Sequence, residues 1–437
     1  MKSLFLFLGN AIIILLIIVL SHKIFTDLKF EKAEHRKTKR DIILLAILFV
    51  VGAFFFNNED SFFKSIFDYS LKILLFFIAL IGFVILRRKR LPKIQISEDL
   101  SIEEVVKRLN EWTKELQIKN LFNGLLYIEK DNEIVFDKHY GFLNFDREKS
   151  IQKSTSFMLG DLSHTFATAC LLNLIEDEKI KKENSISEYI KDFKYSEVTI
   201  ENLLNLEFKL PSISKLKLRI EGHDLSPKAC VKLLSKQRFE KEEIDYIHRK
   251  KEIAYYILIE LIEEVSKLTF SEFLSDQILK PLKMHQTFVY DYDKRNDEIQ
   301  TLNESKIIKF STKNEYIESE YEYDYNYYKY QKVYSNASDL LKWRKYWLDR
   351  KAIIKSMLEN KEEKKRLEPI LGWYTSGEEF IFQDKFCLIQ FDANNTCIYL
   401  TSISDFNRYN GGKINSEINK AYVSIVRKKQ KKFTQSY

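Results

Sequence analysis

The sequence is poor in the residues that build flexible linkers and disulfide frameworks. Its 437 residues include only 11 glycines and 5 prolines, so long flexible linkers are not expected. Lysine and glutamate are interleaved along the chain. The net charge of +7 therefore forms no basic stripe, and nucleic acid is excluded as an expected partner. No CxxC spacing links the four cysteines, so neither a metal site nor a disulfide framework is expected of them: Cys170, Cys230, Cys387 and Cys397. We expect no cofactor.

Three uncharged apolar runs lie within the first 90 residues, at about 4–20, 42–56 and 73–86. Each is shorter than the roughly 20 residues that cross a bilayer core. A buried soluble hairpin is one alternative, and a cleavable signal peptide is another for the first run, which lacks a convincing small-residue cleavage site. We predict a membrane region over 1–90 with three transmembrane helices, the lipid bilayer as a partner, and a link over 91–100.

The charges beside these runs predict their orientation. Lysines and arginines are abundant between the first two runs, whereas Lys64 and Lys72 are the basic residues between the second and third. A further basic cluster, Arg87–Arg90, directly follows the third run. The positive-inside rule places such segments in the cytoplasm, which leaves the N-terminus outside and everything after residue 90 inside.

Residues 101–437 have the pattern of one mixed domain. A capping box at Ser101-Ile-Glu-Glu104 opens an amphipathic helix that runs to about residue 116. A closing amphipathic helix is expected over 415–429. This order predicts an α+β fold, in which an antiparallel sheet is flanked by the terminal helices and joined by a helical subdomain. Strands are expected over 123–129, 133–138, 379–391 and 396–402; further helices over 185–192, 199–206, 252–267, 270–279 and 337–350; irregular or looped chain over 213–249 and 290–332.

The stretch Phe157–Thr168 (FMLGDLSHTFAT) joins an expected strand to an expected helix. Apolar residues run into Gly160, and Asp161 then stands where the helix begins. Aspartate is a favoured N-cap because its carboxylate accepts a free N–H of the first turn. We therefore expect Asp161 to cap this helix, which runs to about Asp177.

Several segments follow one another in the order of a known family. Phe157–Phe166 (FMLGDLSHTF) matches the pattern F-R-I-G-S-x-S-K-x-F, and Leu174–Ile180 (LIEDEKI) matches L-V-E-E-G-K-L. Val198–Leu204 (VTIENLL) matches I-T-I-R-H-L-L, and Leu279–Met284 (LKPLKM) precedes Thr287 as in P-L-G-M-x-x-T. The chain thus resembles the serine beta-lactamase and penicillin-binding-protein-like family, closest to its class C and esterase-type branch, most strongly over 120–425.

The resemblance implies a catalytic serine at a helix start and an activating lysine three residues later. Asp161 and His164 occupy these positions here. Ser163 lies between them and projects about 100° or more away along the helix, which makes it a poor substitute. The family's Tyr-x-Asn motif is also lost. An alignment without a gap gives Lys250-Lys251-Glu252 in its place, and a four-residue gap gives Tyr246-Ile247-His248.

Two further elements depart from the family pattern. Tyr374–Gly377 stands in place of Lys-Thr-Gly or His-x-Gly and runs directly into the next strand, and the H-T-S-G-L-P loop is changed to Leu206–Pro211. Tyr334-Ser335-Asn336 does fit Tyr-x-Asn, but it lies in a segment that resembles a structural helix start. Four altered elements together favour a domain without the ancestral reaction.

We therefore assign no catalytic residue and expect a relict cleft. The first hypothesis is a membrane-anchored, catalytically inactive beta-lactamase-related protein that binds an unknown small-molecule or protein ligand, or regulates. The alternative is an amide or ester hydrolase, of the beta-lactamase or D-alanyl peptidase type, that uses Tyr246 or Lys250 with the Asp161–His164 pair. The residues expected to line the cleft are Asp161, His164, Tyr246, His248, Lys250 and Glu252.

The sequence leaves open both the chemistry of the Asp161–His164 pair and the side of the membrane. Asp161 and His164 are either a helix cap and a polar cleft residue, or a pair that binds a metal or transfers protons. The tyrosine-rich segment 290–332 suits a membrane sensor or complex subunit that contacts a partner. Family members usually act outside the cytoplasmic membrane, so the resemblance places the domain outside, whereas the flanking charges place it in the cytoplasm.

Overall fold

The computed structural model divides the chain into two units, and all residues described below belong to the second, Leu91–Tyr437. The predicted membrane region, residues 1–90 with its three expected helices, lies outside the described residues. Within the described part, no helix has the length and apolarity needed to cross a bilayer. The described residues are 91–119, 121–142, 150–210, 226–236, 247–289, 307–310, 316–319, 332–350, 352, 372–376, 379–383, 387–401 and 405–427.

A sheet in the order β2-β1-β11-β10-β9-β8 organises the domain, and each pairing for which a register is known is antiparallel. The first hairpin is therefore joined to the last strands of the chain, since Gly124 pairs with Thr401 and Glu129 with Thr396. The strands are β1 (Gly124–Lys130), β2 (Glu133–Tyr140), β8 (Tyr374–Ser376), β9 (Glu379–Gln383), β10 (Cys387–Phe391) and β11 (Thr396–Thr401).

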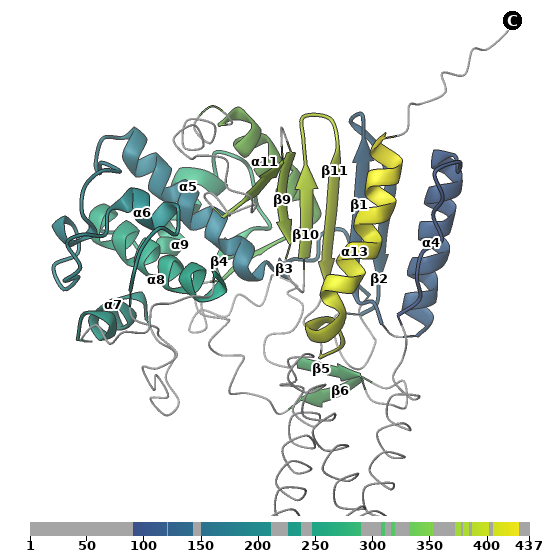
Figure 1. Cartoon of the computed structure of the whole chain (residues 1–437), viewed down its shortest axis with the longest axis horizontal. Coiled ribbons are helices and arrows are strands. Elements are labelled where there is room, and N and C mark those ends of the chain that lie inside the picture. The colour runs from purple at the N-terminus through teal and green to yellow at the C-terminus, as the bar shows by residue number, and fades with distance from the viewer. Residues whose placement is uncertain are drawn as a thin grey trace, which may run out of the picture. The chain divides into compact units, whose positions relative to one another are not determined.

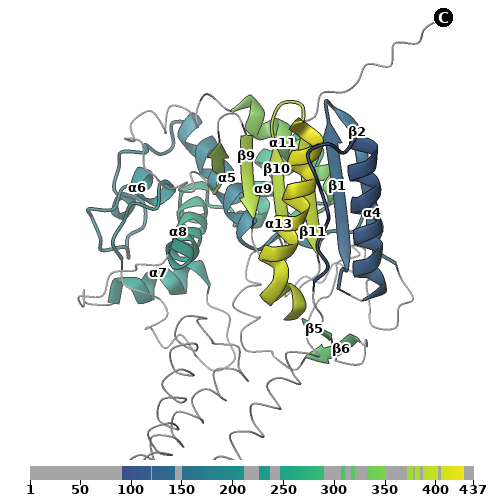
Figure 2. The same cartoon turned by 45° about the vertical axis from the view of Figure 1, so that its right-hand side comes forward.

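The two terminal helices cover one face of this sheet (Figures 1 and 2). Helix α4 (Ile102–Ile118) begins with the expected capping box, in which Ser101 and Glu104 exchange hydrogen bonds. It packs with α13 (Asp405–Arg427) over alternate residues of β1, including Leu126 and Ile128. Period-two alternation sends the neighbouring residues, Leu125 and Tyr127, to the opposite face.

The opposite face carries the larger core and the helical subdomain. Helices α5 (Ser163–Glu176) and α8 (Ile247–Ser266) pack against each other there and contribute many of its buried apolar side chains. The remaining described helical segments are η1 (Gly160–Leu162), η2 (Ile186–Glu188), α6 (Ile200–Leu204), α7 (Pro227–Lys236), α9 (Phe270–Leu274), the π-helical turn η4 (Ser275–Leu279) and α11 (Ala337–Asp349).

Short strands complete the described chain. β3 (Phe157–Met158) and β4 (Phe288–Val289) flank β7 (Val333–Ser335), and β5 (Ile307–Phe310) pairs with β6 (Tyr316–Ser319). The β3–β7 pairing matters most for the site, because it brings residue 332 beside the turn that follows β3.

The predicted α+β architecture is confirmed, with several local corrections. The segment 213–249 is not irregular throughout, since it contains α7 and the start of α8. The expected strand 379–391 is two strands, β9 and β10, which pair as neighbours. The last helix begins at Asp405, ten residues before the expected position. The expected helix 270–279 loosens into the π-helical turn after Leu274.

Candidate active site at the start of helix α5

The turn between β3 and α5 has the sharp geometry that the sequence predicts, but Asp161 does not cap the helix. Gly160 has a φ of +54°, a left-handed value that favours glycine. The chain then forms the 3-10 turn η1, so Asp161 is already helical and α5 begins at Ser163 without a side-chain cap. The expectation of an Asp161 N-cap is therefore wrong, and its carboxylate is free for other contacts.

The Asp161 carboxylate faces Lys332, the residue directly before β7. Lys332 Nζ lies 4.0 Å from Asp161 Oδ1. The lysine side chain is 8% exposed and the aspartate side chain is 41% exposed, so a buried cation faces a partly exposed carboxylate. The ammonium also lies 4.4 Å from the centre of the Tyr255 ring, within cation–π range.

His164 occupies the family's lysine position and is buried. Its Nε2 hydrogen-bonds to the main-chain carbonyl of Lys251, in the second turn of α8. Since a carbonyl only accepts, Nε2 carries the proton. The ring lies 5.1 Å from the Tyr255 ring, centre to centre. Burial and the nearby Lys332 charge lower the pKa of His164 to about 3, so the imidazole is neutral at ordinary pH.

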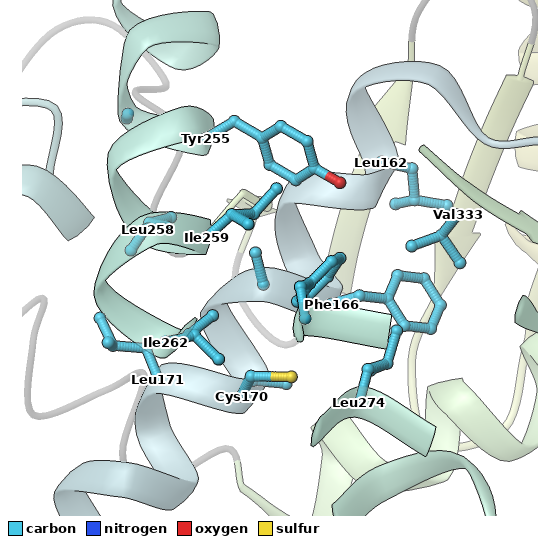
Figure 3. Close-up of a cluster of buried hydrophobic side chains, with 14 of the residues drawn as sticks. Leu162, Phe166, Cys170, Leu171, Tyr255, Leu258, Ile259, Ile262, Leu274 and Val333 are labelled. Carbon is cyan, nitrogen blue, oxygen red and sulfur yellow. The ribbon is translucent and has the colours of Figure 1, made fainter. Parts of the chain in front are cut away.

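Ser163 is fully buried and is committed to the fold. Its Oγ accepts a hydrogen bond from the main-chain N–H of Val333 at 2.9 Å. Burial raises the pKa of Tyr255 above the ordinary tyrosine value, and a hydrogen bond with Ser163 acts in the opposite direction. The Tyr255 side chain points from α8 toward the first turn of α5 (Figure 3). Ser163 is thus no exposed nucleophile.

An apolar layer lies beneath these polar groups. Phe166 and Cys170 from α5 lie in one cluster with Ile259 and Ile262 from α8, and Leu162 of η1 lies beside Val333 in the same cluster (Figure 3). Burial raises the pKa of the Cys170 thiol well above its ordinary value, so it is an inert core residue. The site therefore lies at the polar end of a closely packed helix pair.

The structure brings Asp161 and His164 together but directs Lys250 elsewhere. Lys250 Nζ donates to the carbonyl of Leu206 at 3.3 Å and lies over the Phe208 ring, so it holds the altered Leu206–Pro211 loop. Leu206 has a φ of +56° in that loop. Tyr246 lies outside the described residues. His248 and Glu252 lie on α8, but their side chains are outside the described part of the molecule.

The strand expected to carry the third motif approaches α5 through Gly372. This residue has a φ of +85°, and a Cβ added to it would lie 2.9 Å from Thr165 Cγ2 and 3.4 Å from His164 Cβ. Trp373 follows in the core, and β8 follows at the edge of the sheet. Glycine is therefore required here for close packing against the first turn of α5.

The segment Tyr334-Ser335-Asn336 is structural, as predicted. Tyr334 and Ser335 belong to β7, and the Asn336 side chain accepts a hydrogen bond from the Asp339 N–H as the N-cap of α11. Tyr334 stacks on Phe288, 5.4 Å away between ring centres.

Lys332 and Tyr255 are the site residues that the sequence analysis missed. Tyr255 lies within a segment that matches the family, but its position on α8 marks it only as part of an apolar face. Lys332 lies at the end of the tyrosine-rich segment, and its place beside Asp161 follows from the pairing of β3 with β7. A local sequence pattern carries no signal for that contact.

The sequence and the fold agree with a known family of proteins. A sequence model of the Beta-lactamase family matches residues 110–370, which is more than half of the chain. The chain belongs to the beta-lactamase family. It is 28% identical over 173 residues to the teichoic acid D-alanine hydrolase of Staphylococcus aureus, a match that covers 39% of this chain and 42% of that protein. The chain thus matches about two fifths of that curated relative's length.

Solved structures support the same fold. The crystal structure of FmtA from Staphylococcus aureus aligns with a TM-score of 0.55 at 17% identity, over 77% of this chain and 93% of that one. A penicillin-binding protein from Bacillus halodurans aligns with a TM-score of 0.54 at 15% identity, over 73% and 99%. At these identities the likeness establishes the fold, and the altered residues of this site must be judged on their own contacts.

Proposed function

We propose that this chain is a membrane-anchored, beta-lactamase-related protein that binds a ligand beside the start of α5 without acyl transfer. The observation that carries the proposal is Asp161 at the nucleophile position, paired with Lys332. Acyl transfer in this family needs a nucleophile and a nearby base. Here Ser163 is buried, and the Nε2–H of His164 donates a hydrogen bond to a main-chain carbonyl.

A covalent-labelling experiment tests this proposal. The full chain in detergent is exposed to a fluorescent penicillin and to a fluorophosphonate, beside an active serine hydrolase as the positive control. We expect no covalent adduct on this chain. The D161S variant restores the hydroxyl but leaves His164 in place of lysine, so it is expected to label weakly at most. Labelling of the unaltered chain that disappears on changing one side chain would overturn the proposal.

One observation favours a second candidate, a hydrolase with a rearranged site. Lys332 brings an ammonium to the nucleophile end of α5, where it lies beside both Asp161 and Tyr255. A relative is named teichoic acid D-alanine hydrolase, so D-alanyl esters are the substrates to offer. Release of D-alanine from such an ester by the full chain, abolished in D161N and K332M but retained in K342M, would establish this candidate instead.

Attachment to the membrane is part of the proposal and rests on the three apolar runs. The basic residues beside them favour a cytoplasmic domain, whereas the family's usual place is outside. Alkaline phosphatase fused after residue 95 folds actively only outside the cytoplasm, so we expect an inactive fusion. An active fusion would place the domain outside.

A further inference from the structure

Lys332 is a buried cation beside Asp161, the residue at the family's nucleophile position. We propose that Lys332 anchors an anionic oxygen group of the ligand, a carboxylate or a phosphate, and that Asp161 competes with this group for the ammonium. The inference rests on the proposed binding function and specifies the chemistry of the ligand.

Burial is the first step of the argument. Lys332 is 7% exposed, and an ammonium removed from water must be compensated by charge and hydrogen bonds. It has three N–H donors. Among the residues that the structure describes, its charged partner is Asp161 at 4.0 Å, which is beyond hydrogen-bond distance, and its other partner is the face of the Tyr255 ring. Its charge is therefore balanced by one carboxylate at the limit of ion-pair distance and by an aromatic ring.

The partner carboxylate is the second step. The Asp161 side chain is 41% exposed, whereas that of Lys332 is 8% exposed. A pair with one partly exposed member is weakly held, because water already solvates that carboxylate. A ligand oxygen that enters from the Asp161 side can therefore replace the carboxylate without leaving it buried and unpaired.

The charge around the pair is the third step. Lys251 lies at the start of α8 and is close enough to lower the pKa of His164 further. His164 itself is neutral at ordinary pH. One acidic group, Asp161, thus lies near two basic groups, Lys332 and Lys251, and this excess favours an anion over a cation.

Two substitutions are expected to have opposite effects on anion binding. The full chain in detergent is titrated with sodium phosphate and, separately, with sodium acetate at constant ionic strength, and binding is measured by the shift in unfolding temperature. We expect K332M to weaken binding at least tenfold, because the ammonium is lost. We expect D161N to tighten it at least threefold, because the competing charge is lost.

A matched control separates this site from general charge effects. Lys342 also pairs with an aspartate, Asp339, but it lies on α11, so K342M is expected to leave binding unchanged. Binding of phosphate alone, acetate alone or both supports the inference and distinguishes the two ligand classes. If K332M does not fold, D161N decides the question by itself.

Three results would overturn the inference: binding of neither anion by the unaltered chain, equal losses in K332M and K342M, or a D161N variant that binds no more tightly. The labelling experiment remains independent. A chain that is acylated by penicillin but loses anion binding in K332M contradicts the proposed function and retains the role of Lys332.

Discussion

The imidazole of His164 donates a hydrogen bond to the main-chain carbonyl of Lys251. This bond joins the first turn of α5 to α8 at the position where the family carries a lysine. The bond fixes Nε2 of the buried, neutral imidazole. The family's activating cation is therefore absent from α5, and a lysine ammonium approaches the same region from the residue before β7.

Protonation of His164 is expected to destabilise the domain in acid. Its folded pKa of about 3 lies below the unfolded value of 6.5. The unfolded chain therefore binds more protons between these values, and stability falls as the pH is lowered through this window. From pH 7 to pH 5 we expect the imidazole to contribute a loss of about 2 kcal/mol.

The H164Q variant isolates this contribution, because glutamine keeps an N–H donor without a titrating group. Urea unfolding at pH 7 and pH 5 provides the measurement. H164Q should lose about 2 kcal/mol less than the unaltered chain over this interval. Equal losses in the two proteins would show that His164 is not neutral in the folded state.

Glu260 on α8 is expected to act in the opposite direction. It is buried, and burial together with the nearby Glu263, Glu264 and Asp192 raises its pKa to about 7, which the Lys228 charge from α7 only partly offsets. The folded state then binds more protons than the unfolded state between about pH 4.5 and 7. Stability from this group is present below that window and is lost as the pH rises through 7.

The E260Q substitution removes the free-energy cost of keeping an ionised Glu260 buried beside other carboxylates. Because the surrounding charges are partly solvated, we expect E260Q to stabilise the domain by about 1–2 kcal/mol at pH 8 and to have little effect at pH 4.5. The neighbouring E264Q is the control, since Glu264 has a lowered pKa and pairs with Lys228 at 3.5 Å. A gain in E260Q that is independent of pH would contradict this account.

Arg344 forms a buried connection between α11 and the sheet. Its Nη1 lies 2.7 Å from Glu129 Oε1, and its Nη2 donates to the Ala393 carbonyl at 2.6 Å. The R344M variant leaves Glu129 buried without its cation, and we expect a loss of about 3–5 kcal/mol. The double variant E129Q/R344M should lose less than R344M, because no unpaired charge remains. Chemical denaturation of the three proteins measures the difference, and equal losses would exclude a charge penalty.

Gly372 is expected to tolerate no side chain. The G372A variant combines a φ of +85° with a contact to Thr165 at 2.9 Å, so we expect a loss of about 1–3 kcal/mol. The matched control is G412A on α13, where a Cβ would meet nothing within 4 Å. Alanine there should stabilise the helix by up to about 1 kcal/mol. Thermal unfolding of both variants tests the contrast, which similar shifts would contradict.

Local signals predicted much of the fold. The capping box before α4 forms as predicted, because it depends on residues within one turn. Capping boxes also form before η2 and α6, where the sequence analysis expected only short helices. Helix α7 was missed although it has a comparable signal: Ser226 accepts from the Ala229 N–H, and Pro227 occupies the first helical position.

The candidate site was predicted only in part, because its contacts join distant segments. The altered residues at 161 and 164 could be found by comparison with the family pattern. The cap role assigned to Asp161 was wrong, because a 3-10 turn precedes the helix. The position of Lys332 beside Asp161 depends on the pairing of β3 with β7. The direction of the Lys250 side chain depends on its hydrogen bond to the Leu206 carbonyl. Neither arrangement leaves a local pattern in the sequence.

The pairing of β1 with β11 has a consequence for biosynthesis. Gly124 pairs with Thr401, so β1 leaves the ribosome long before its central partner exists. Until then, β1 and β2 form a hairpin whose apolar faces lack both β11 and α13. Contacts so distant in sequence make closure of the sheet slow, whereas α5 and α8 can meet earlier. A nascent chain arrested before residue 396 should therefore carry a protected helical subdomain and a protease-sensitive first hairpin.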